Sequence, residues 1–281
     1  MLRCGVDPQD TCGPKIQTGR SVPGVTTAER AAELLRLHTD PELLVVLNVW
    51  DVISATVVAD VPRTKALATA SHSIAATLGY PDGERIPRDL MIDMVGRIAA
   101  AVDLPVSADL EAGYGDAGET ARRAIGVGIV GANLEDQMKP LPDAVAAVAA
   151  VVKAGEAEGV PFVLNARTDA FLRAGDRDRA DVIADAVERG RAFLDAGASC
   201  VFVPGLLDEP TVTALVQGIG ERRVSVINVP GSLPQARLAE LGVARVSFGP
   251  WTQRATLTYL ADLAADLYAG GALPEGVRPL N

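Results

Sequence analysis

Cysteine, histidine and long apolar runs are scarce in this chain of 281 residues, and each scarcity excludes a class of protein. Three cysteines cannot form an even disulfide framework, and no second Cys or His pair near Cys4 and Cys12 completes a zinc pattern. No stretch approaches about 18 apolar residues without a charge, so no membrane span is expected. The first residues lack the apolar segment of a secretory signal, and we therefore expect a cytoplasmic protein.

Basic residues are in the minority, with 26 Lys and Arg against 36 Asp and Glu and a formal net charge of −10. A negative surface repels nucleic acid and anionic membranes, so neither is expected as a partner. An anionic small molecule is not excluded, because cations at one site outweigh the charge of the whole protein locally.

Short apolar runs alternate with Ala-rich helical segments after the first 25 residues. Residues 1–25 are polar, contain Gly and Pro and predict a flexible extension, whereas 26–281 predict a single domain whose first helix is capped by Thr26 or Thr27. The apolar runs are 43–48, 65–69, 105–109, 131–135, 161–166, 199–203, 224–228 and 244–248. Helices are predicted near 52–61, 87–102, 117–128, 141–157, 178–196, 209–219, 233–241 and 251–268.

Runs that are apolar throughout indicate parallel strands covered on both faces. Eight alternating units of this kind predict an α/β fold closed into a (β/α)8 TIM-type barrel. A doubly wound open sheet is the alternative, but it usually has a Gly-rich turn after the first strand, where this chain has NVWDVISA. In a barrel the active site forms at the C-terminal ends of the strands, so the residues after each run are the candidates for chemistry.

Four carboxylates follow successive runs: Asp82, Asp109, Glu111 and Glu135. Like charges gather at one site only if a cation neutralises them or protons are retained. Carboxylates without a Cys or His cluster suit Mg²⁺ or Mn²⁺, and we expect Asp109 as the direct ligand with the other acids holding the metal's waters. The alternative is that these acids are unrelated surface residues.

Arg167 ends the fifth run amid this acidic rim. A guanidinium there can bind a substrate carboxylate or phosphoryl group; the alternative is an ion pair that orders Asp169 or Glu135. Trp50 and Asn228 follow the first and seventh runs, and Trp50 is either a wall of the pocket or a packing residue.

The chain has only two histidines. His72, between two serines after the second run, is a candidate general acid or base near neutral pH, or else a hydrogen-bonded loop residue. His38 follows an amphipathic helix and is expected to be a solvated or capping residue.

Several motifs occur in a specific order: NVWD (48–51), LGYPDGE (78–84), ADLEAGYG (108–115), NLEDQ (133–137), NARTDAF (165–171), DAGASCVFVPG (195–205) and LGVARVSFGP (241–250). In this order they resemble the isocitrate lyase/phosphoenolpyruvate mutase superfamily over roughly residues 40–265. The resemblance implies a (β/α)8 barrel whose last helix is commonly exchanged between subunits, in a homodimer or homotetramer. It also implies small 2-oxo or 2-hydroxy acid substrates and Mg²⁺ at the acids Asp82, Asp109, Glu111 and Glu135. The substrate's carboxylate and 2-oxygen would be held by the segment Ala70, Ser71 and His72.

Two departures from the family's patterns narrow the activity. The lyases carry a Cys on the loop after the fourth strand, but here NLEDQ continues into MKPLPD without one. Phosphonate-handling members have a His at the end of the sixth strand, where this chain has Pro204. The resemblance therefore favours a Mg²⁺-dependent lyase or decarboxylase of a small 2-oxo dicarboxylic acid such as oxaloacetate. A carbon–phosphorus bond enzyme acting on phosphonopyruvate and a non-catalytic 2-oxo-acid-binding protein are the alternatives.

Overall fold

Nine parallel strands form the sheet of this computed structural model, which describes residues 25–280. Neighbouring strands follow the order β1-β9-β8-β7-β6-β5-β4-β3-β2. The strands are β1 (Leu44–Val45), β2 (Leu47–Val49), β3 (Leu67–Thr69), β4 (Val106–Asp109), β5 (Gly131–Glu135), β6 (Val163–Arg167), β7 (Cys200–Val203), β8 (Val224–Ile227) and β9 (Arg245–Ser247).

The first predicted strand is divided in two, and this division closes the barrel. β1 pairs with β9 and β2 pairs with β3, so one extended segment borders both ends of the sheet. Val46 lies between the two strands, and its N–H donates to the carbonyl of Val246 at 3.0 Å. The other predicted strands each have one counterpart. The (β/α)8 TIM-type barrel is thereby confirmed, and the open-sheet alternative is wrong.

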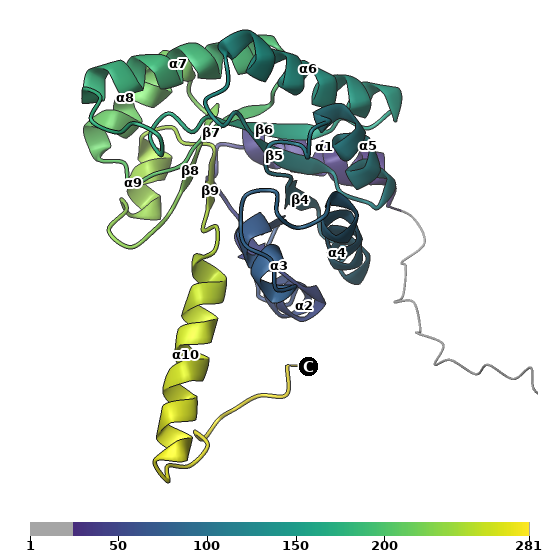
Figure 1. Ribbon diagram of the computed structural model, residues 1–281, viewed down its shortest axis with the longest axis vertical. Coiled ribbons are helices and arrows are strands. Elements are labelled where there is room, and N and C mark those ends of the chain that lie inside the picture. Colours follow the sequence, from purple (N-terminus) through teal and green to yellow (C-terminus); the bar gives the residue numbers. More distant parts are fainter. Residues whose placement is uncertain (1–24, 281) are drawn as a thin grey trace, which may run out of the picture.

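Helices alternate with the strands and cover the outside of the barrel, with α6, α7 and α8 in one layer over the strands that they connect (Figure 1). They pack apolar faces against the strands, which forms the core. The helices are α1 (Thr27–Thr39), α2 (Val52–Ala59), α3 (Ser71–Thr77), α4 (Arg88–Ala101), α5 (Ala117–Gly126), α6 (Leu141–Ala157), α7 (Arg179–Asp195), α8 (Glu209–Ile219), α9 (Gln235–Glu240) and α10 (Trp251–Tyr268).

Helix α1 precedes the barrel and covers the N-terminal ends of its strands. Thr26 caps it through a capping box with Glu29, as its position predicts. Leu34 is fully buried against Gly131, the first residue of β5. His38 points the same way and is 2 % exposed, so the expectation of a solvated or capping residue is wrong. Burial lowers the pKa of His38 to about 3, which keeps the imidazole neutral.

Helix α10 leaves the barrel instead of covering it (Figure 1). Gln253 is its only buried residue, whereas the side chains of Leu257, Leu260 and Tyr268 are 52 %, 57 % and 93 % exposed. A groove of about 510 Å³ remains on the barrel wall between α9 and the connection from α2 to β3, and Leu47 of β2 lies in it, 37 % exposed. Both the helix and the wall thus present apolar surface to solvent in a single chain.

The predicted extension 1–25, with Cys4 and Cys12, lies outside the described residues except for the exposed Val25. Cys200 is buried in β7. None of the helices between residues 25 and 280 is long and apolar enough to span a membrane.

Candidate active site

Charged side chains meet at the C-terminal ends of three adjacent strands, β4, β5 and β6. Asp109 is the last residue of β4, and Glu135 and Arg167 are the last residues of β5 and β6. Glu135 and Arg167 are direct partners in the register of these two strands. Asp82 lies in the connection between α3 and α4, close enough for its charge to raise the pKa of Glu111. The structure therefore brings the four predicted carboxylates and Arg167 to one mouth of the barrel.

Asp109 is held by the start of α3. Its Oδ2 accepts the Ser71 hydroxyl at 2.7 Å and the Ser71 backbone N–H at 3.1 Å, while its own N–H donates to Thr69 Oγ1 at 2.9 Å. These contacts order the carboxylate and leave its other oxygen, Oδ1, without a hydrogen bond among the described residues. The sequence predicted no helix at this point, and the structure places Ser71 at the start of helix α3.

Glu111 follows β4 and faces the loop before α4. Its carboxylate accepts the Tyr114 hydroxyl at 2.8 Å and the backbone N–H of Glu84. Burial raises the pKa of Glu111 to about 6, and the nearby Asp109 and Asp82 charges act in the same direction, although the two hydrogen bonds oppose them. A buried carboxylate next to two other negative charges is stabilised in its ionised form by a cation bound beside it.

The backbone of this rim is left-handed at several residues that are not glycine. Positive φ values between 50° and 58° occur at Glu84, Glu111, Tyr114, Gln137 and Met138. Residues with a Cβ avoid this region because the Cβ approaches the following carbonyl oxygen. All five belong to the loops that carry the carboxylates, whereas Arg63 and Arg222, the two other such residues described, precede strands. The strain is thus concentrated at the mouth.

Arg167 is ion-paired on two sides. Its Nη1 lies 2.9 Å from Glu135 Oε2, and its Nε donates to Asp169 Oδ1 at 2.7 Å. Burial alone would lower the pKa of Arg167, but the charges of Glu135, Asp169 and Asp109 outweigh burial and raise it. Burial raises the pKa of Glu135 to about 7, against the opposing effect of Arg167. The ion pair considered as an alternative to substrate binding is present, and Nη2 of Arg167 has no hydrogen bond to any residue between 25 and 280.

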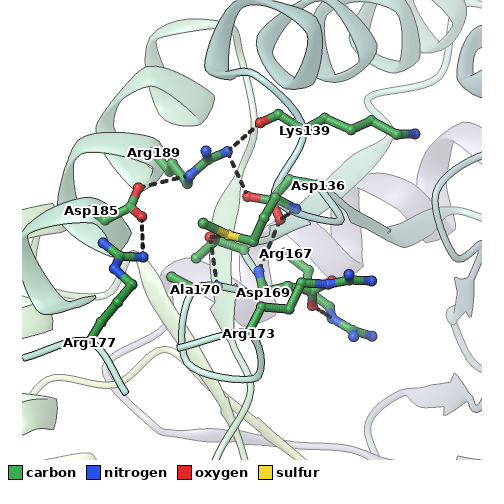
Figure 2. A network of polar contacts seen from close by, with 11 residues as sticks. Asp136, Lys139, Arg167, Asp169, Ala170, Arg173, Arg177, Asp185 and Arg189 are labelled. Carbon is green, nitrogen blue, oxygen red and sulfur yellow. Dashed lines mark hydrogen bonds and ion pairs between the residues drawn. The ribbon is translucent and has the colours of Figure 1, made fainter. Parts of the chain in front are cut away.

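A second buried ion pair, between Arg189 and Asp136, lies next to Arg167 and Asp169 (Figure 2). Arg189 of α7 contacts Asp136 Oδ2 at 3.2 Å, the Lys139 carbonyl at 3.0 Å and Asp185 at 2.9 Å. Asp136 Oδ1 accepts the backbone N–H groups of Met138 and Asp169. Asp136 therefore ties the loop after β5 to the loop after β6, and it fixes the residue that holds Arg167.

The other predicted site residues lie around the same mouth. Ala70 is the N-cap of α3, and its N–H donates to Val49 at 3.3 Å. His72 is in the first turn of α3 and not in a loop, and its buried Nδ1 has no hydrogen-bond partner among residues 25–280. Trp50 is partly buried against the core, and Asn228 donates to the Leu233 carbonyl at 3.2 Å, which orders the loop after β8. No hydrogen bond of the His72 side chain assigns it a role.

The donor set fits a hard divalent cation that keeps part of its water. The four carboxylates share one mouth, and burial raises the pKa of Glu111 and of Glu135. Within residues 25–280 no three acidic, Cys or His side chains are close enough to form a ligand shell by themselves. Mg²⁺ commonly binds in this way, through one or two carboxylates with several waters retained.

Four further residues at or below the mouth were not predicted: Ser71 as a hydroxyl donor to Asp109, Tyr114, Arg189 and Arg245. Arg245 of β9 lies inside the barrel, 1 % exposed, with Nη1 3.3 Å from Ser107 Oγ. Burial lowers the pKa of Arg245 to about 10, opposed by Cys200 and Asp109. An Arg within a strand run is a recognisable signal, because such a position faces either the barrel interior or the helices.

Comparison with known proteins supplies the family. Residues 34–268 match the family model described as phosphoenolpyruvate phosphomutase. A crystal structure from Burkholderia cenocepacia, described provisionally as a phosphonomutase, is 39 % identical, with a TM-score of 0.79 over 84 % of this chain and 99 % of the other. An uncharacterized protein of Mycobacterium tuberculosis is 34 % identical over 85 % of this chain and 88 % of its own. An oxaloacetate decarboxylase of Pseudomonas savastanoi is 26 % identical over 70 % of both chains.

Proposed function

We propose that this chain, which belongs to the phosphoenolpyruvate mutase family, is a Mg²⁺-dependent carbon–carbon lyase. The family is part of the isocitrate lyase/phosphoenolpyruvate mutase superfamily. The superfamily resemblance in the sequence motifs is confirmed, and with it membership in a superfamily of lyases and mutases. The substrate that we propose is a small 2-oxo dicarboxylic acid such as oxaloacetate, decarboxylated at the barrel mouth.

One observation carries this proposal: the carboxylates at the ends of β4 and β5 share the mouth with Arg167. A bound Mg²⁺ or Mn²⁺ would supply a positive charge that stabilises the negative charge developing as the carbon–carbon bond breaks. When the carboxylate attached to carbon 3 of a 2-oxo acid leaves as CO₂, no base has to remove a proton. The missing Cys of the family's lyases is therefore no obstacle to decarboxylation. The connection from β5 to α6, residues 136–140, is short and has no Cys; of its two ionisable side chains, Asp136 is paired with Arg189 and Lys139 is exposed.

The residues of this chain would bind and orient the acid. Arg167 would pair with its distal carboxylate, because a guanidinium forks onto a carboxylate. In the segment 70–72 the backbone N–H groups of Ala70 and Ser71 donate to Val49 and Asp109. The N–H of His72, which has no intrahelical partner in the first turn of α3, and the Ser71 hydroxyl would face the carboxylate and 2-oxygen at the other end. His72 lies in that turn and would deliver a proton to the product carbon, while Trp50 and Asn228 would limit the pocket.

A carbon–phosphorus bond enzyme is the second candidate, and the 39 % identity to the Burkholderia cenocepacia protein favours it. Arg167 would then bind the phosphoryl group. Pro204 at the end of β7 opposes this candidate, because it supplies no proton donor where phosphonate-handling relatives have a His.

Turnover of oxaloacetate, phosphonopyruvate and alkylmalates, each with and without Mg²⁺, tests the proposal. We expect Mg²⁺-dependent release of pyruvate from oxaloacetate and its loss in Asp109→Ala, with folding checked by circular dichroism. Turnover of phosphonopyruvate alone would favour the second candidate. Tight binding of 2-oxo acids without turnover of any of the three would instead identify a binding protein.

We also propose that the chain assembles as a homodimer or homotetramer through α10. The helix exposes apolar residues away from its own barrel, and the groove beside α9 is open and lined mainly, though not entirely, by apolar residues. The last helix of one subunit would cover the barrel wall of another, as the family resemblance implies.

A further inference from the structure

The two carboxylate partners of Arg167 are held with different firmness. Asp169, which receives Nε, is fixed from behind, because its backbone N–H donates to Asp136 and Asp136 pairs with Arg189 (Figure 2). The carboxylate of Glu135 has one further partner among the described residues, the Gln137 amide at 3.2 Å. The Asp169 side of Arg167 is therefore anchored, and the Glu135 side can exchange.

Glu135 also belongs to the carboxylates that we propose for the cation, so its oxygens have two competing uses. At equal distance, a divalent ion attracts a carboxylate about twice as strongly as a guanidinium does. Glu135 is thus expected to turn toward the cation. Arg167 would remain in place, because Asp169 still holds its Nε.

We propose that Glu135 exchanges Arg167 for the divalent cation, and that this exchange frees the Nη1 edge of Arg167 to bind the substrate's carboxylate. The inference rests on the proposed function and adds an order of binding: cation first, acid second. Without the cation, an anionic substrate would have to displace Glu135 from Arg167. It would also be repelled by the neighbouring carboxylates, whose negative charge no cation neutralises.

The first test measures Mn²⁺ affinity by electron paramagnetic resonance. Arg167→Met should bind Mn²⁺ roughly tenfold more tightly than the wild type, because Glu135 loses one charge-assisted hydrogen bond that competes with the ion. Arg173→Met is the matched control: Arg173 lies 3.9 Å from Asp169, and its salt bridges do not include Glu135, so its loss should leave the affinity unchanged. In a Glu135→Gln background the effect of Arg167→Met should shrink.

The second test uses oxalate as the probe, by calorimetry without metal. Glu135→Gln should bind oxalate about tenfold more tightly than the wild type, since its amide pairs less strongly with Arg167. Glu111→Gln removes the same charge from the same mouth, but the structure shows no contact of Glu111 with Arg167 among residues 25–280, so it should gain clearly less.

The outcomes separate the inference from the function on which it rests. Weaker or unchanged Mn²⁺ binding in Arg167→Met would show that Arg167 supports the site only structurally, and equal gains in the two glutamate variants would show a general charge effect. Either result overturns the exchange and leaves a metal-dependent lyase in place. A wild-type protein that bound no Mn²⁺ would overturn both.

Discussion

Leu257 and Leu260 provide a test of whether α10 is an assembly element. Their side chains are 52 % and 57 % exposed in the single chain. Complete burial of a Leu side chain contributes about 1.5–3 kcal/mol, so burial of the exposed half contributes about half as much. A two-fold dimer uses both residues twice. The double substitution Leu257→Ala, Leu260→Ala should therefore weaken the dimer by about 3–6 kcal/mol.

This loss corresponds to a dissociation constant that is higher by roughly two to four powers of ten. Sedimentation velocity over a concentration series from nanomolar to micromolar measures it, with circular dichroism as a check of folding. Leu90→Ala is the matched control, because Leu90 is 40 % exposed on α4, away from α10. A wild-type protein that remained monomeric, or a double variant with an unchanged dissociation constant, would refute the reasoning.

Three further predictions concern charge at and below the mouth. Asp136→Asn should lower Tm by about 3–12 °C, because buried Arg189 loses a charge-assisted partner. Asp185→Asn should lower Tm less in the same calorimetric scan, and a larger loss in Asp185→Asn would contradict the conclusion that Asp136 is the main partner of Arg189. Mn²⁺ affinity should fall as pH decreases through 7 and 6, because protons compete with the ion for Glu135 and Glu111, whose pKa values are raised to about 7 and about 6. If the affinity does not change between about pH 7.5 and about pH 5.5, these two residues are not the ligands. Arg245→Met should leave Tm unchanged or raise it, since the lowered pKa of Arg245 reflects an unfavourable burial of charge that Met avoids; a loss of more than a few degrees would show that its contact with Ser107 is indispensable.

Much of the fold could be predicted because each strand is apolar throughout and ends in polar residues. The eight runs and their helices depend on local patterns, which a sequence displays directly. Helix α3 was missed because SHSIAAT is short and contains Ser, His and Thr, residues of modest helix propensity. The division of the first strand was missed because it depends on pairing with β9, about 200 residues later in the chain.

The candidate site was predictable in position but not in its contacts. Strand ends locate Asp109, Glu135 and Arg167, because parallel strands of a barrel bring their C-terminal ends together. The bond from Ser71 to Asp109 joins residues 38 positions apart, and Arg189 and Asp136 are 53 positions apart. No periodicity encodes such pairs, and the burial of His38 likewise follows from where α1 docks on the barrel.

The left-handed rim residues imply a trade-off between stability and activity. Each such residue costs roughly 1–2 kcal/mol relative to an unstrained backbone, so five of them amount to a large share of the 5–15 kcal/mol by which a typical domain is stable. Glycine at Gln137 or Met138 would relieve that strain locally. A selection for heat-resistant variants should therefore recover substitutions in these loops, and the variants recovered should bind the cation and the acid less well, because the same strained turns aim Glu111 and Glu135 into the mouth.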